Sequence, residues 1–327
     1  MGMKLLVTGA RGFVGRGLCQ RLATRGHTGI ATGREAPQGL PACWIAASRQ
    51  SLLDATASAA TPADIHAIVH LEVKQHVPRP TAADIDAFTA VNVGGTRAWL
   101  DWASRHGIRR FVLISSIKAV AADDGPMGEE SRPETTAPYG RSKAEAEAAM
   151  RLWAAADPAR SAVILRPTPV YGPGNEANLA AFVRQILAGK PCLIGGGETR
   201  KSIVSRENLC AAIEFAAERP TPGCAIFNVS DRETPSLRDL ATAIAKLAGA
   251  PTPKRIPAWV AGLVAPLGDA IEGLTGRDFP LTSARLRALR ETTIFPCDKL
   301  VAAGFVHPQT TRDGLAEMIA WARQSRG

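Results

Sequence analysis

The chain has 327 residues, of which 46% are hydrophobic and 21% are charged, a composition typical of a globular protein long enough for two lobes. The formal net charge is +9, but the basic residues are scattered and only 5% of residues are aromatic. This pattern excludes a nucleic-acid partner and favours attraction of anionic nucleotides or phosphorylated substrates.

The cysteines and the apolar segments bear on compartment and ligands. Six cysteines show neither CxxC nor zinc spacing, so we predict reduced thiols, a cytoplasmic protein and no metal site. The apolar segment at 259–274 is interrupted by Pro266, Asp269 and Glu272. It is too short to span a bilayer, and we therefore predict no membrane partner.

The first half of the chain alternates short apolar strands with helices. Because strands that alternate with helices of this length form parallel sheets, the pattern predicts an α/β fold with a doubly wound, Rossmann-type parallel sheet. In chain order we expect strand 4–8, helix 13–24, strand 28–32, strand 64–70, helix 89–105, strand 110–115, helix 139–156 and strand 161–165.

After residue 167 the chain becomes richer in proline and glycine, with clusters at 167–174, 189–197 and 219–223. We therefore predict an NAD(P)-binding domain at 1–167 and a smaller α/β substrate-binding lobe at 168–327. Two short apolar runs in that lobe, at 203–204 and 225–229, are expected to return to the main sheet as strands.

A glycine loop joins the first strand to the first helix. Gly9 allows a sharp turn, Gly12 allows the backbone to approach a pyrophosphate, and Gly15 allows the helix to pack closely on the strand. The N-terminus of that helix supplies N–H groups and a positive dipole end. The loop predicts a dinucleotide site made of Gly9, Arg11, Gly12, Phe13, Val14 and Gly15.

The end of the second strand bears on which dinucleotide binds. An NAD site usually offers an acidic residue there for the ribose hydroxyls, but this chain has Thr32-Gly33-Arg34. Arg34, together with Arg11, is suited to pair with a 2′-phosphate. The sequence thus favours NADP(H) over NAD(H), although Glu35 keeps NAD(H) open.

Three residues form a candidate catalytic set. Tyr139 and Lys143 are spaced i and i+4, on one face of a helix. A phenol is a poor base at neutral pH, and a nearby cation stabilises its phenolate. Ser116 follows a buried strand, at the edge where α/β folds place groups that face a ligand. We predict that Ser116 binds the substrate oxygen that exchanges a proton with Tyr139.

The order and spacing of these motifs resemble the extended short-chain dehydrogenases/reductases of the NAD-dependent epimerase/dehydratase type, across the whole chain. Within that group the chain resembles nucleotide-sugar 4-epimerases and 4-ketosugar reductases. The resemblance is carried further by His70-Leu71 at a strand end, Asn92-Val-Gly-Gly-Thr96 at a helix start, and Arg166-Pro-Thr-Pro-Val-Tyr171-Gly-Pro-Gly174. It implies that Leu71 lines the cofactor, together with Tyr139 and Lys143.

The resemblance also implies substrate-binding residues in the second lobe. Asn178-Leu179 fits the pair that contacts a substrate diphosphate, and Arg200-Lys201 fits the basic strand start that binds phosphate. The chain departs from the family pattern at three points. Gln50-Ser51 replaces Gly-Asp, Glu72-Val73 replaces Ala-Ala, and Ser205 replaces an aromatic residue or histidine.

These observations predict an NAD(P)-dependent nucleotide-sugar epimerase or 4-ketosugar reductase acting on a UDP- or other NDP-sugar. The alternatives are an NADPH-dependent reductase of an apolar ketone, with 258–279 as an apolar lid, and a non-catalytic dinucleotide-sensing regulator. The helices at 89–105 and 139–156 resemble those that pair in dimers of this family, which implies a homodimer.

Overall fold

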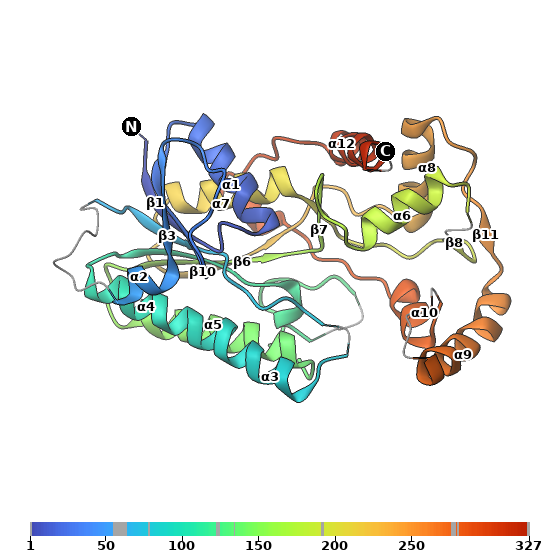
Figure 1. Cartoon of the computed structure of the whole chain (residues 1–327), viewed down its shortest axis with the longest axis horizontal. Helices are drawn as coiled ribbons and strands as arrows, with labels where there is room; N and C mark the ends of the chain where they lie inside the picture. The colour runs from blue at the N-terminus through green and yellow to red at the C-terminus, as the bar shows by residue number, and fades with distance from the viewer. Residues whose placement is uncertain are drawn as a thin grey trace. The chain divides into compact units, whose positions relative to one another are not determined.

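Seven parallel strands form the main sheet in a computed structural model of the chain, which describes residues 2–54, 64–77, 79–121, 125–133, 135–190, 193–275, 279 and 281–325. Their order is β10-β6-β5-β4-β1-β2-β3 (Figure 1). The strands are β1 (Lys4–Thr8), β2 (Thr28–Gly33), β3 (Trp44–Ser48), β4 (Ala67–His70), β5 (Arg110–Ile114), β6 (Ser161–Pro167) and β10 (Gly223–Val229). The predicted doubly wound parallel sheet is confirmed.

Helices cover both faces of this sheet (Figure 1). On one face α1 (Phe13–Thr24) packs beside α7 (Arg206–Glu218), and on the other lie α4 (Gly95–Arg105) and α5 (Pro138–Ala155). The core under α4 and α5 is apolar and includes Trp99, Trp102 and Phe111. The shorter elements here are α2 (Arg49–Asp54), α3 (Ala82–Phe88), a π-helical turn η1 (Thr89–Gly94), a 3₁₀ turn η2 (Ile117–Ala119) and α11 (Asp298–Ala302).

The chain divides into two compact units, each made of three segments. The first unit comprises Met1–Val170, Arg206–Ser230 and Phe295–Pro308, and the second comprises Tyr171–Ser205, Asp231–Ile294 and Gln309–Gly327. The second unit has an apolar core between three of its helices, α6, α8 and α12. Its elements are β7 (Val170–Tyr171), α6 (Asn178–Leu187), β8 (Leu193–Ile194), β9 (Val204–Ser205), α8 (Leu237–Ala248), β11 (Arg255–Ile256), α9 (Ala258–Thr275), α10 (Ser283–Arg290) and α12 (Thr311–Gln324).

Some sequence expectations need correction. The run at 225–229 does return to the main sheet, as β10 paired with β6, but 203–204 does not. The strand there is β9, and it pairs with β7 in a separate two-stranded sheet. The strand expected at 64–70 begins only at Ala67, since Asp64 has a φ of 88°, outside the extended region. Strand β3 was not indicated by the apolar pattern of the sequence.

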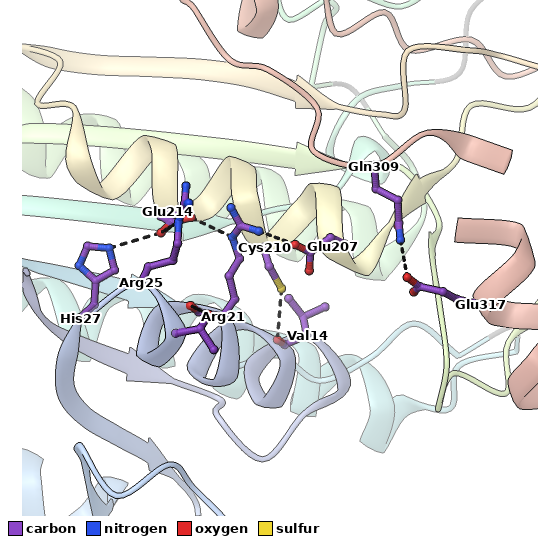
Figure 2. A network of polar contacts seen from close by, with 10 residues as sticks. Val14, Arg21, Arg25, His27, Glu207, Cys210, Glu214, Gln309 and Glu317 are labelled. Atoms are coloured by element: carbon purple, nitrogen blue, oxygen red, sulfur yellow. Dashed lines mark hydrogen bonds and ion pairs between the residues drawn. The ribbon is translucent and has the colours of Figure 1, made fainter. Parts of the chain in front are cut away.

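Ion pairs join α7 to α1, although the two helices are far apart in the chain (Figure 2). The buried carboxylate of Glu214 accepts hydrogen bonds from Arg21 Nε at 2.8 Å and from Arg25 Nε at 3.3 Å. His27 Nε2 lies 3.3 Å from the same carboxylate, and Arg21 also pairs with Glu207. Because the two arginines already supply positive charge to Glu214, this cluster is a structural ion-pair network that holds α7 on the first unit.

Two glycines of α1 test how closely that helix must approach its neighbours. A Cβ at Gly15 would lie 2.5 Å from the carbonyl oxygen of Gly9, whereas a Cβ at Gly17 would meet only the flexible side chain of Arg206. We expect Gly15→Ala to lower the free energy of unfolding by about 1–3 kcal/mol and to weaken dinucleotide binding. Gly17→Ala serves as the matched control, since it gains the same helix propensity. Equal thermal midpoints and equal binding for the two variants would contradict the close approach.

Candidate active site

The glycine loop lies where β1 and β4 end side by side. Gly9 has a φ of +67°, and a Cβ there would lie 2.7 Å from the backbone carbon of Leu71, the residue that follows β4. A side chain at this position is therefore excluded both by the backbone angle and by the neighbouring strand. The sheet order reverses here, since β1 pairs with β2 on one side and with β4 on the other. Open α/β sheets bind ligands at such a reversal.

The start of α1 has the features of an anion site. Its N-cap is Gly12, which offers no side-chain acceptor, and its first turn holds no acidic residue. The first N–H groups of the helix are thus left to a ligand. At this helix start the Phe13 ring lies under Arg206, and the backbone carbonyl of Val14 accepts from Cys210 (Figure 2). The pyrophosphate of a dinucleotide fits this helix start.

His70, the last residue of β4, gives a second sign of a ligand. Thr8 Oγ1 accepts hydrogen bonds from the amides of Leu71 and Glu72, so its own proton goes to His70 Nδ1 at 2.7 Å. Burial lowers the pKa of His70 to about 3, with the charges of Lys143 and Arg49 adding to the effect. The ring is neutral and protonated on Nε2, a buried atom that has no partner among the described residues. A bound cofactor would supply one.

The end of β2 carries the residues expected to choose between NAD(H) and NADP(H). Arg34 is exposed, and no hydrogen bond or ion pair of its guanidinium is found within the described ranges. Arg11, by contrast, forms an exposed ion pair with Glu35. The two arginines therefore differ, since only Arg11 has a carboxylate partner among the described residues.

Glu72, one departure from the family pattern, has its own counter-charge. Arg49 Nη1 donates to Glu72 Oε1 at 3.2 Å, and the indole of Trp99 lies 3.3 Å from Oε2. Arg49 begins α2, directly before Gln50-Ser51, the other departure in this region. Gln50 bonds Asp54 of its own helix and Ser51 bonds Ser48, so both side chains serve local structure.

Tyr139 and Ser116 meet at the end of β5. Tyr139 is buried in the first turn of α5, with the rings of His76 and Phe88 edge-on to it at 5.7 and 5.8 Å. Burial raises the pKa of the Tyr139 hydroxyl, and a hydrogen bond with Ser116 opposes that rise. The neighbouring Ser115 points elsewhere, because its hydroxyl donates to Glu147 at 2.6 Å. Of the two serines, only Ser116 therefore interacts with the tyrosine.

Lys143 lies one turn after Tyr139 on the same helix and is fully buried. Its Nζ donates to the carbonyl of Ile114 at 2.7 Å. Burial lowers the pKa of Lys143 to about 8, although the negative charge of Glu147 opposes this. The ammonium is still largely charged at neutral pH, and its electrostatic effect reaches His70. A cation is thus held beside the tyrosine at the cofactor-facing edge of the sheet.

Two further contacts fix the helix that carries these residues. Asn92 of the π-helical turn donates to Ser142 Oγ at 2.9 Å and accepts from the amide of Lys74 at 2.8 Å. Glu147 forms a fully buried, bidentate pair with Arg166 of β6, at 2.9 and 2.7 Å. The sequence analysis did not predict this pair. Its signals were the position of Glu147, four residues after Lys143, and the position of Arg166 at the start of the Arg166–Gly174 motif.

Of the predicted substrate residues, Ser116 lies in the first unit, and those expected to contact the diphosphate lie in the second. Asn178 opens α6, whose N-cap makes no side-chain hydrogen bond and whose first turn holds no acid. Leu179 packs partly on the core of that unit. Arg200 Nε donates to the carbonyl of Thr234 at 2.9 Å, and burial lowers the pKa of Lys201 while nearby Glu291 raises it. The backbone amide of Ser205 binds the buried carboxylate of Asp231.

Comparison with known proteins identifies the group. A profile of the NAD dependent epimerase/dehydratase family matches residues 5–230, more than half of the chain. The protein belongs to this family. Among its relatives is the N-acetyl-alpha-D-glucosaminyl-diphospho-ditrans,octacis-undecaprenol 4-epimerase of Escherichia coli O157:H7, 28% identical over 71% of this chain and 70% of that one. Another is the 2-alkyl-3-oxoalkanoate reductase of Stenotrophomonas maltophilia, 30% identical over 76% and 77% of the two chains.

A solved structure extends the likeness to the whole fold. The UDP-glucuronic acid 4-epimerase from Bacillus cereus, in complex with NAD, superposes with a TM-score of 0.75 over 99% of this chain and 100% of that one, at 20% identity. The family match makes the chain an enzyme of the epimerase/dehydratase type, as its motifs predicted.

The buried cation of Lys143 should cost stability in the absence of ligand. Its pKa of about 8 in the folded state lies below the 10.5 of the free side chain. This loss of unfolding free energy is fully present below pH 8. It disappears as pH rises from 8 to 10.5, because in that range the unfolded state binds more protons than the folded state. We expect Lys143→Met to raise the free energy of unfolding by about 1–3 kcal/mol at neutral pH, and by less at high pH.

Thermal unfolding at neutral and alkaline pH measures this difference. Lys246→Met, on an exposed face of α8, is the matched control and should show no such dependence on pH. A Lys143→Met protein less stable than the parent at neutral pH contradicts the account.

Proposed function

We propose that the protein is a nucleotide-sugar epimerase or 4-ketosugar reductase that moves a hydride between NAD(P) and a sugar carbon, with Tyr139, Lys143 and Ser116 handling the proton. The observation that carries the proposal is the burial of Tyr139 and Lys143 one turn apart on α5, with the Lys143 ammonium fixed on the carbonyl of Ile114, two residues before Ser116. This arrangement holds a proton donor and acceptor next to a hydrogen-bonding hydroxyl and a cation.

The three side chains divide the work on the substrate oxygen. A bound nicotinamide dinucleotide supplies the hydride acceptor or donor. In the oxidative direction Tyr139, as phenolate, takes the hydroxyl proton of the sugar, and in the reductive direction the phenol returns it. Ser116 holds the oxygen by a hydrogen bond throughout. Lys143 stabilises the phenolate, which burial alone would disfavour.

The sugar is proposed to be held through its diphosphate. Asn178 at the open N-terminus of α6, together with Arg200 and Lys201, offers the N–H groups and positive charge that a diphosphate requires. The Escherichia coli relative is a 4-epimerase of a sugar carried on a diphosphate. That likeness supports chemistry at carbon 4 of a diphosphate-linked sugar, and the net charge of +9 favours such an anion.

A second candidate is a reductase of an apolar ketone, favoured by the relative named 2-alkyl-3-oxoalkanoate reductase. Such a reductase would use the same three residues, but its apolar substrate would have no phosphate for the basic pair Arg200-Lys201 to bind. A dinucleotide sensor without turnover would have no need to keep Ser116 against Tyr139. Turnover with UDP-sugars and their 4-keto forms, compared with long-chain ketones, separates the three possibilities.

The two adjacent serines provide the sharpest test of the catalytic set. We expect Ser116→Ala to lower kcat roughly a hundredfold or more, and Tyr139→Phe at least as much. Cofactor affinity should change little in both. Ser115→Ala should keep kcat but lose about 1.5–3 kcal/mol of stability, because Ser115 binds the carboxylate of Glu147. Steady-state kinetics and thermal unfolding of the three variants measure this. If Ser116→Ala turned over normally, the assignment would be wrong.

The cofactor is proposed to be NADP(H), on the basis of Arg34 and the missing acid at the end of β2. Mass analysis of cofactor released from denatured protein, followed by titration of the apo form with NADH and NADPH, measures the preference. We expect NADPH to bind more tightly than NADH. Arg34→Ala should weaken NADPH binding roughly tenfold and so remove this preference, because a charge-assisted contact is lost. Retained NAD with little affinity for NADPH points instead to a self-recycling epimerase, in which Arg34 is a surface charge.

A further inference from the structure

Helix α9 turns an apolar face outward. Trp259, Leu263, Leu267, Ile271 and Leu274 follow one another at spacings of four, four, four and three residues, which places them on one side of the helix. Each is between 41 and 88% exposed. An uninterrupted apolar stripe of this length on a protein surface usually marks a binding face.

The opposite face of α9 is packed, so the stripe cannot simply rotate inward. Ala261 and Ala265 are buried against Leu286 of α10. Gly268 lies so close to the backbone of Leu281 that a side chain there would clash. The buried carboxylate of Glu272 accepts the amide of Phe279 at 2.8 Å. Small residues and a buried hydrogen bond thus fix this helix with its large apolar side chains pointing away from its unit.

An exposed cation lies at the N-terminal end of the stripe. Arg290 Nη2 donates to the carbonyl of Ala258 at 3.1 Å, which places this exposed cation at the N-terminus of α9, and Arg287 lies one turn earlier on α10. The acidic groups are engaged: Asp269 accepts the amide of Ser283, and Glu291 acts on Lys201. In the part of 254–291 that the structure describes, the exposed charged side chains are Lys254, Arg255, Asp269, Arg287, Arg290 and Glu291.

We propose that α9 docks the protein on a phospholipid bilayer that carries anionic headgroups. The helix lies along the surface, with Trp259 and the leucines entering the acyl boundary and the neighbouring cations meeting the headgroups. None of the helices among the described residues has the length and hydropathy to cross a membrane. The sequence-based prediction of no membrane partner rested on that requirement alone, which a helix lying in the interface does not have to meet.

A bilayer suits these observations better than a second copy of the chain. A bilayer accepts a long stripe without a complementary shape, and its anionic headgroups complement the exposed cations Arg255, Arg287 and Arg290. The proposal does not depend on the hydride chemistry, because α9 carries no residue of the catalytic set.

Vesicle sedimentation tests the proposal with the full-length protein. We expect co-sedimentation with vesicles of phosphatidylcholine mixed with phosphatidylglycerol, and much weaker binding to phosphatidylcholine alone. Leu263→Gln with Leu267→Gln should reduce the bound fraction roughly tenfold or more, since two large apolar side chains leave the interface. Ile45→Gln with Val306→Gln removes two equally exposed apolar side chains elsewhere and should leave binding unchanged.

Four results overturn the proposal. The parent protein could stay in the supernatant with anionic vesicles, or both double variants could bind like the parent. In a third result, the α9 variant changes only the oligomeric state measured by light scattering, and that result assigns the face to a second copy. Circular dichroism and turnover of a water-soluble substrate are measured alongside. Both should be unchanged in the α9 variant, and a lost turnover would assign the stripe to a substrate lid.

Discussion

The candidate active site depends on the buried ion pair between Glu147 and Arg166. Helix α5 carries both Tyr139 and Lys143, and Glu147 stands one turn further along it, bound in bidentate fashion to the end of β6. Ser115, at the end of β5, binds the same carboxylate. Removing one partner of such a pair leaves an uncompensated buried charge, at a cost of about 3–5 kcal/mol. The pair thus fixes the position of α5, which carries Tyr139 and Lys143, relative to the ends of β5 and β6.

The positive charge of the chain is divided among several tasks. Arg21 and Arg25 hold α7 to α1, and Arg166 pairs with the buried Glu147. In our proposals Arg34 and the Arg200-Lys201 pair bind phosphate groups, and the cations near α9 meet a lipid surface. A net charge of +9 alone could not distinguish these roles, because it records the sum and not the partners.

The sequence predicted the parts that follow from local rules. The glycine loop, the Tyr139–Lys143 helix and the strand before Ser116 each have a short-range pattern, and the parallel sheet follows from their alternation. Pairings over long distances were not predictable. The sequence did not indicate that β9 pairs with β7 and not with the main sheet, or that Glu72 meets Arg49. The strand β3 was missed because its outer positions are exposed at the sheet edge, which weakens the apolar signal.

The same limit applies to α9. An apolar segment that is too short to span a bilayer is expected to be buried, and only the packing of its small residues on α10 shows which side faces outward. The roles of Asn178, Arg200 and Lys201 are likewise predictions, because they follow from the family resemblance and not from a local pattern.

Deuterium transfer tests the central claim most directly. Apo protein would be loaded with reduced nicotinamide cofactor that carries two deuteriums at carbon 4, and given a UDP-4-keto sugar in a single turnover. The account predicts a 4-hydroxy sugar that carries one deuterium, for an epimerase and a reductase alike, and no such product from Tyr139→Phe. Unchanged ketosugar in the presence of bound cofactor would contradict it.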